Sequence, residues 1–180
     1  MGMLIEDGKG SGQSAEVKGN KLRTYAVTEA EQHHVNEDVG GAYSILIDAT
    51  TAAVDDQFFH FKNTGTDEIH ITSMKGFVSA DTEIKVLIGV TGSATAATDI
   101  TPVNRNAASG KTLTATVEEG ADLLMTGGSV VDLFRLDSAA VSIDKLTWGS
   151  SLILPKNGTL ALESSAAATI NLTVSCYAHS

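Results

Sequence analysis

The densest group of potential metal ligands in this sequence is the segment HHVNED at residues 33–38. Imidazole and carboxylate groups bind zinc, and His33 and Glu37 are four residues apart, so they would share one face of a helix. Adjacent side chains such as His33 and His34 point apart in either regular structure, however. The sequence also contains no H-x-x-x-H pair. We therefore interpret the segment, which ends at Asp38, as a solvated acidic turn, and predict neither a metal ion nor another cofactor.

Motifs for covalent or phosphate chemistry are incomplete in this chain. The segment ASGKT at residues 108–112 resembles the end of a phosphate-binding loop, but the full motif needs a Gly where Arg105 stands. No serine lies in a G-x-S-x-G nucleophile elbow. The adjacent carboxylates of Asp55 and Asp56 are more typical of a loop cap than of a catalytic acid and base. The sequence thus predicts a protein that is not an enzyme.

The single cysteine, Cys176, excludes an intrachain disulfide. It shares its parity with Ile170, Leu172 and Val174 in the alternating stretch TINLTVSCYA at 169–178. Strict alternation places one set of side chains on a buried face of a strand. Cys176 is therefore predicted to be a small inward-facing hydrophobic residue rather than a reactive thiol.

Short strands dominate the rest of the pattern. The predicted strands are YSILID (43–48), DQFFHFKN (56–63), EIHITSMKGFV (68–78), EIKVLIGVTG (83–92), TLTATVEE (112–119), SVVDLFRLD (129–137) and VSIDKLTW (141–148). Turn residues separate them at the spacing of an all-β protein. No segment offers room for the crossover helices of a parallel sheet. The sequence predicts an antiparallel two-sheet sandwich of jelly-roll type.

The last part of the chain carries the clearest pattern. LIL at 152–154, a PKNG turn at 155–158, TLALE at 159–163 and the final strand predict an antiparallel meander. The stretch at 91–110 has few large apolar residues and predicts a long exposed loop.

Two parts are expected along the chain. Residues 1–20 are rich in Gly, Ser and Lys with few apolar residues, and predict an extended N-terminal arm. Residues 21–180 predict a single β-sandwich domain.

Charge and hydropathy exclude some classes of partner. The formal net charge is −10 and the isoelectric point is about 4.8. Phosphate backbones are bound through Lys and Arg, so we expect no nucleic-acid partner. The first 20 residues contain no long apolar run, and we expect no signal peptide and no membrane partner.

Both ends of the chain resemble a family of small tailed-phage virion proteins. LIEDGKGSGQSAEVKGNKLRTYAVTEAE at 4–31, with its A-x-V and N-x-L-R spacing, is followed by GGAYSI at 40–45. LPKNGTLALESSAAATINLTVSCYAH at 154–179 is similar to the closing strands of the same group. The resemblance implies a β-sandwich decoration or cement protein on the outside of an assembled capsid, bound to the major capsid protein and often trimeric.

Partner contacts follow from this reading as expectations. The basic residues of the arm and its border, predicted to bind the capsid, are Lys9, Lys18, Lys21 and Arg23. A homotrimer is expected because DQFFHFKN and SVVDLFRLD carry apolar side chains on both faces, and its predicted contacts are Phe58, Phe59 and Phe134. The alternative is a tail or fibre module that binds a host-surface glycan, since jelly rolls also serve as lectins.

Overall fold

The computed structural model describes residues 4–6, 14–18, 21–23, 36, 40–138 and 144–179, with the side chains of 40–138 and 152–179. The chain divides into two compact units, Met1–Ala30 and Glu31–Ser180. Each unit is described by itself.

The first unit contains three short strands. They are β1 (Leu4–Glu6), β2 (Ser14–Lys18) and β3 (Lys21–Arg23), which form an antiparallel sheet in the order β1-β2-β3. The pairing of Val17 with Leu22 joins β2 to β3. The segment that the sequence predicted as an extended arm therefore contains a small sheet, and the division at Ala30 places β3 with this sheet rather than with the sandwich.

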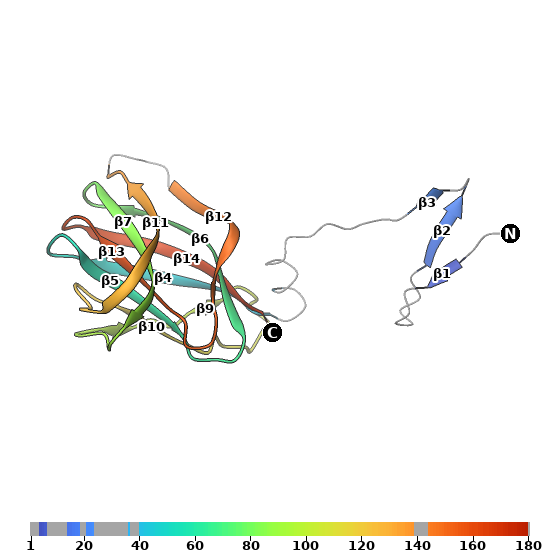
Figure 1. The fold of residues 1–180 in the computed structure, drawn as a ribbon, viewed down its shortest axis with the longest axis horizontal. Coiled ribbons are helices and arrows are strands. Elements are labelled where there is room, and N and C mark those ends of the chain that lie inside the picture. The colour runs from blue at the N-terminus through green and yellow to red at the C-terminus, as the bar shows by residue number, and fades with distance from the viewer. Residues whose placement is uncertain are drawn as a thin grey trace. The chain divides into compact units, whose positions relative to one another are not determined.

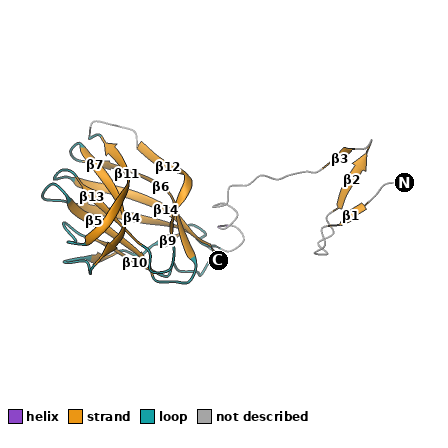
Figure 2. Cartoon of the chain, in the orientation of Figure 1, coloured by secondary structure: helices purple, strands orange, loops and turns teal. Residues whose placement is uncertain are grey.

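The second unit is built from eleven strands in two antiparallel sheets (Figures 1 and 2). They are β4 (Ala42–Thr50), β5 (Asp56–Asn63), β6 (Glu68–Val78), β7 (Thr82–Thr91), β8 (Thr98–Asp99), β9 (Val103–Asn104), β10 (Ala115–Glu119), β11 (Thr126–Leu136), β12 (Asp144–Leu154), β13 (Thr159–Ser164) and β14 (Thr169–His179). The six-stranded sheet has the order β11-β7-β13-β5-β10-β8, and the five-stranded sheet has the order β12-β6-β14-β4-β9.

The connections between the long strands are those of a jelly roll. Apart from β8, β9 and β10, each sheet contains four strands, β11-β7-β13-β5 in one and β12-β6-β14-β4 in the other. Consecutive long strands lie in opposite sheets, except for β7 and β11, which pair with each other. The predicted fold class, an antiparallel two-sheet sandwich, is confirmed.

The meander predicted at the end of the chain is not present. The PKNG turn does form, since the Gly158 N–H donates to the Pro155 carbonyl at 2.7 Å and Asn157 has a φ of 64°. It carries the chain from β12 in the five-stranded sheet to β13 in the six-stranded sheet, where β13 pairs with β5 and β7. The turn is therefore a corner between the two layers. The strand before it and the strand after it each face the core from a different sheet.

The core lies between the sheets and is formed by the inward-facing residues of every long strand. Its largest fully buried members include Phe58, Phe59, Phe61, Ile45, Ile71 and Leu162. Cys176 belongs to this core and is completely buried, and burial raises its pKa to about 12. The predicted role of Cys176 as a small hydrophobic residue is thus confirmed.

The predicted loop at 91–110 is partly ordered as strands. β8 pairs with β10 in one sheet and β9 pairs with β4 in the other, so the segment crosses from layer to layer. The Asn104 side chain organises its second half: the amide donates to the carbonyls of Gly40 at 2.7 Å and Lys111 at 3.0 Å. Small side chains allow this path because Ala94 and Ala97 pack against buried residues of the sheet beneath them.

We predict that Gly76→Ala destabilises the sandwich by about 1–3 kcal/mol, the usual cost of overpacking. A Cβ at Gly76 would collide with the Asn171 carbonyl oxygen and with Leu172 on β14. Urea unfolding of the variant checks this. Gly110→Ala is the matched control, because a Cβ there meets nothing within 4 Å. Equal stability of the two variants would contradict the close approach of β6 to β14.

Candidate interaction surface

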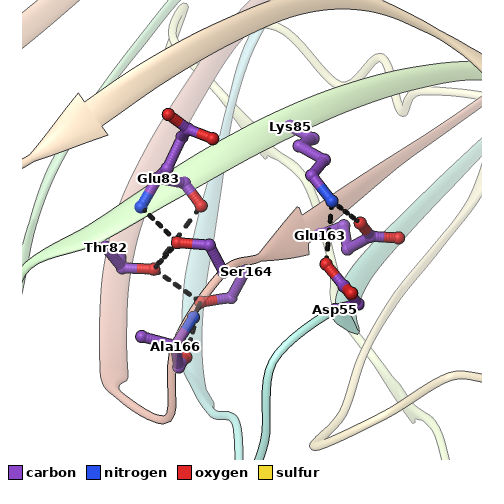
Figure 3. Close-up of polar contacts among 8 residues, drawn as sticks. Asp55, Thr82, Glu83, Lys85, Glu163, Ser164 and Ala166 are labelled. Atoms are coloured by element: carbon purple, nitrogen blue, oxygen red, sulfur yellow. Dashed lines mark hydrogen bonds and ion pairs between the residues drawn. The ribbon is translucent and has the colours of Figure 1, made fainter.

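The strongest group of ion pairs joins β7, β13 and the turn before β5 in the six-stranded sheet (Figure 3). The Lys85 Nζ lies 2.8 Å from Asp55 Oδ1 and 2.7 Å from Glu163 Oε1. Hydrogen bonds to Asp55 and then to Glu163 raise the pKa of Lys85, and the same bond from Lys85 lowers the pKa of Asp55. Lys85 is thus held as an ammonium ion, and a permanently protonated amine is neither a nucleophile nor a base.

A hydroxyl cluster lies beside it, also in Figure 3. The Ser164 hydroxyl donates to the Ala166 carbonyl at 2.8 Å, and the Thr82 Oγ1 lies 2.9 Å from the Ser164 Oγ. Neither hydroxyl has a hydrogen bond to an imidazole or a carboxylate among the described residues. Because an activated nucleophile needs such a base, these contacts close the end of the sandwich and do not form a catalytic arrangement.

A shallow pocket of about 250 Å³ adjoins these hydroxyls. Its lining residues are Asp81, Thr82, Glu83, Arg135 and Ser165. Asp81 accepts from the backbone N–H of Ser138 at 2.9 Å and from its hydroxyl at 2.8 Å, and lies 3.3 Å from Arg135 Nη2. These bonds, the Ser138 backbone first, lower the pKa of Asp81 to about 2. Asp81 therefore ties the β6–β7 turn to the end of β11.

The described imidazoles lie in two places, since the ring centroids of His70 and His179 are 5.8 Å apart and His60 is on the other sheet. His60 Nδ1 is 2.8 Å from Glu118 Oε2 on the six-stranded sheet. His70 stacks on Tyr177 on the five-stranded sheet, with ring centroids 4.8 Å apart. The described part of the chain contains no cluster of three His, Cys, Asp or Glu residues that could hold a metal ion. The segment HHVNED, apart from Asn36, lies outside the described residues.

The outer face of the six-stranded sheet is covered by loops of the same chain. Leu87 and Ala161 form a cross-strand pair on this face, and Leu123 and Met125, from the β10–β11 connection, pack on them. The Leu123 N–H donates to the Gln57 carbonyl at 2.7 Å, which holds the connection against β5. This loop shields the centre of the sheet from any partner.

The outer face of the five-stranded sheet is open by contrast. Four exposed hydrophobic side chains stand on its strands: Leu46 on β4, Phe77 on β6, Val103 on β9 and Ile153 on β12. Small polar residues, mainly Ser, Thr and Asn, separate them. We call the part formed by Leu46, Asp48, Lys75, Phe77, Asn171 and Thr173 the open face.

Strand register defines the geometry of the open face. Asn171 on β14 pairs directly with Asp48 on one side and with Phe77 on the other. Thr173 in the same way pairs with Leu46 and with Lys75. Directly paired residues point to the same side of a sheet, and neighbouring strands lie about 4.8 Å apart. The open face therefore consists of two parallel rows of three side chains.

The predicted trimer contacts need correction. Phe58 and Phe59 are completely buried in the core, so they offer no surface to a second chain. Both faces of DQFFHFKN are covered within one chain, because the β10–β11 connection hides the outer side. Phe134 is partly buried against the core, while Val131 and Leu133 beside it are exposed.

The predicted capsid-binding residues are only partly within the described structure. Lys9 lies outside the described residues. Lys18 and Lys21 are directly paired across β2 and β3, and Arg23 is paired with Glu16. The side chains of these strand residues lie outside the described part.

Sequence reasoning did not identify Leu46 and Phe77. Leu46 was detectable, since it has the opposite parity to Ile45 and Ile47. Phe77 was not, because it shares its parity with the buried Ile71. A register shift pairs Ser175 with Ser73 and Cys176 with Ile71, so one residue of β6 is extra and the outward set changes.

Comparison with known proteins does not assign the chain to a family. No family model matches the chain, and no curated protein matches it. None of the helices in the described residues has the length and apolar character to cross a membrane.

The titration of Asp81 tests the capping geometry. We expect an Asp81 pKa near 2 by carboxyl NMR, and an increase in Ser138→Ala, which removes the hydroxyl donor and keeps the N–H. Because the folded pKa is depressed, the associated stability is present above pH about 4 and declines as the pH falls toward 2. Asp67→Asn is the control: this exposed carboxyl lies at the opposite end of β6, and its change should leave the Asp81 pKa as it is. An unchanged Asp81 pKa in Ser138→Ala would disprove the hydroxyl contact.

Proposed function

We propose that this protein is a non-enzymatic virion structural protein that decorates and stabilises a phage capsid by binding the major capsid protein on the capsid exterior. The observation that carries the proposal is the division into a small N-terminal β unit and a jelly roll with its own core. A self-contained head and a separate segment are what a protein needs in order to attach at one part and present the other. The resemblance of both chain ends to small phage virion proteins supports the same function.

The described chemistry is compatible with a structural role. Lys85, Thr82 and Ser164 are engaged in bonds that close the sandwich, and Asp81 and Arg135 in the neighbouring pocket are paired with each other. We therefore propose that binding comes from surfaces rather than from a reactive site.

Charge is unevenly distributed between the units. Residues 1–30 contain four basic and four acidic residues, so the entire net charge of −10 belongs to residues 31–180. A capsid surface that carries carboxylates would repel the jelly roll and tolerate the first unit. We therefore assign the attachment to the first unit, with Lys9, Lys18, Lys21 and Arg23 as its cations.

Deletion of residues 2–30 should leave the melting temperature of the jelly roll unchanged and abolish binding to capsids. The described members of the core of the second unit all lie within residues 43–178. Thermal unfolding and cosedimentation with undecorated capsids measure the two effects. If the shortened chain decorates capsids as well as the full chain does, attachment belongs to the jelly roll and the proposed role of the first unit fails.

Charge reversals test the cations of the first unit, and a second pair of reversals on the jelly roll is the matched control. Lys18→Glu with Lys21→Glu should weaken cosedimentation by up to about fivefold per charge, since one exposed ion pair is worth about 0–1 kcal/mol. Lys111→Glu with Lys156→Glu makes the same charge change at exposed positions of the jelly roll and should have no effect.

We also propose that the protein is a homotrimer with β11 at its contact. β11 is an edge strand of the six-stranded sheet and exposes Val130, Val131 and Leu133, with Leu133 47% exposed. Exposed apolar edge strands associate readily with other chains, and closed symmetry buries them.

Sedimentation tests this contact. The wild-type protein should sediment at three times its 18.7 kDa chain mass, and Val131→Lys with Leu133→Lys should sediment as a folded monomer. Val54→Lys, at an exposed position in the β4–β5 connection, should remain trimeric. A wild-type species of one chain mass at micromolar concentration would contradict the proposal.

A further inference from the structure

We propose that the open face of the five-stranded sheet binds a neutral saccharide, with a pyranose ring stacked on Phe77 and its hydroxyls hydrogen-bonded to Asp48 and Asn171. This activity is additional to capsid attachment and does not depend on it.

The aromatic ring is available for stacking. Phe77 is 59% exposed although its strand, β6, is paired with β14 at this position. The preceding residue, Gly76, has no side chain and allows β6 to approach β14 closely. A pyranose has one face of C–H groups, and the negative face of an aromatic ring attracts such weakly positive hydrogens. Phe77 can therefore provide the apolar half of a sugar site.

Hydrogen-bonding groups stand in the same row as the ring. Asn171 is the direct neighbour of Phe77, and Asp48 is the next residue across β14. At two strand spacings, the backbones of Asp48 and Phe77 are about 10 Å apart, so one sugar ring that lies over Asn171 can reach both side chains. An amide supplies both donors and acceptors, and a carboxylate accepts from two hydroxyls.

These groups are not engaged elsewhere among the described residues. The only described hydrogen bond of Asp48 is made by its backbone N–H, to Glu119 Oε2 at 2.8 Å. The Asn171 amide and the Lys75 ammonium have no hydrogen bond to a described residue. The strands fix the backbone positions of these residues, and their unpaired donors and acceptors are available to a hydroxylated ligand.

The arrangement fits a saccharide better than a protein partner. Leu46 and Phe77 stand on β4 and β6, in different rows, and Thr173 and Asn171 of β14 separate them. Protein interfaces have an apolar centre that is poor in charge, and this face has no continuous apolar centre. A single aromatic ring framed by polar groups can instead stack on one sugar ring and leave the polar groups for its hydroxyls.

Charge indicates that the ligand is neutral. The open face carries one carboxylate, Asp48, and one ammonium, Lys75, in adjacent rows. The jelly roll as a whole has a net charge of −10, and such a field repels sulfated or uronic-acid polysaccharides. The ligand class is therefore neutral oligosaccharides of hexose and N-acetylhexosamine units.

The experiment uses the full-length protein without capsids. A panel of neutral hexose and N-acetylhexosamine oligosaccharides is first tested by array, and the best binder is titrated by NMR. Binding should shift the amide signals of Asp48, Phe77 and Asn171. Phe77→Ala should lower affinity at least tenfold, Phe77→Trp should retain it, and Asn171→Ala should lower it severalfold. Val54→Ala, at an exposed position in the β4–β5 connection, should have no effect.

Three results would overturn the proposal. The first is no binding of any oligosaccharide in the panel at millimolar concentration. The second is binding that Phe77→Ala leaves unchanged, which would place the sugar elsewhere. The third is a Phe77→Ala protein that loses cosedimentation with capsids while the wild type binds no sugar, which would assign the open face to a protein partner. The first two results do not bear on whether residues 1–30 attach the chain to a capsid, because that function has its own deletion test. The third result would also contradict attachment through residues 1–30 alone.

Discussion

The fold depends on the insertion of β14 between β4 and β6. β14 is paired along its whole length on both sides, with Thr169 opposite Thr50 at one end and His179 opposite Glu68 at the other. Its partners lie more than one hundred residues earlier for most of these pairs. Loop closure over such distances costs entropy before the contacts repay it, so sheets of this kind fold slowly. The five-stranded sheet is complete only when the end of the chain is in place.

The corners of the sandwich are held by buried polar groups rather than by apolar packing. Asn63, at the end of β5, is completely buried. Its side-chain amide donates to the carbonyls of Asp67 at 2.8 Å and Leu154 at 2.9 Å. The backbone carbonyl of Asn63 accepts from the Asn157 N–H at 2.8 Å. One side chain thus joins the β5–β6 turn to the β12–β13 corner. A buried amide with all of these partners specifies the path of the chain at a place where two layers meet.

The two outer faces serve different purposes. The six-stranded sheet is covered by the β10–β11 connection, and Leu123 of this connection is completely buried against the sheet. The five-stranded sheet leaves Phe77 exposed beside unpaired polar groups. In the proposed function the first unit attaches the chain to a capsid, the β11 edge joins the copies, and the open face remains available to a ligand from solution.

The sequence by itself determined the class of the fold and most of its strands. DQFFHFKN and EIHITSMKGFV coincide with β5 and β6, and the parity of Cys176 predicted its burial, because side-chain alternation is a local property of a strand. Only the tertiary structure decided which layer each strand joins, which is why TLALE pairs with β5 and β7 rather than with its neighbours in sequence. The same holds for the burial of Phe58 and the exposure of Phe77. The first depends on a bulge in β5, where Leu162 pairs with Phe59 and Glu163 with Gln57 so that Phe58 is the extra residue. The second depends on one extra residue in β6, and neither is visible in local periodicity.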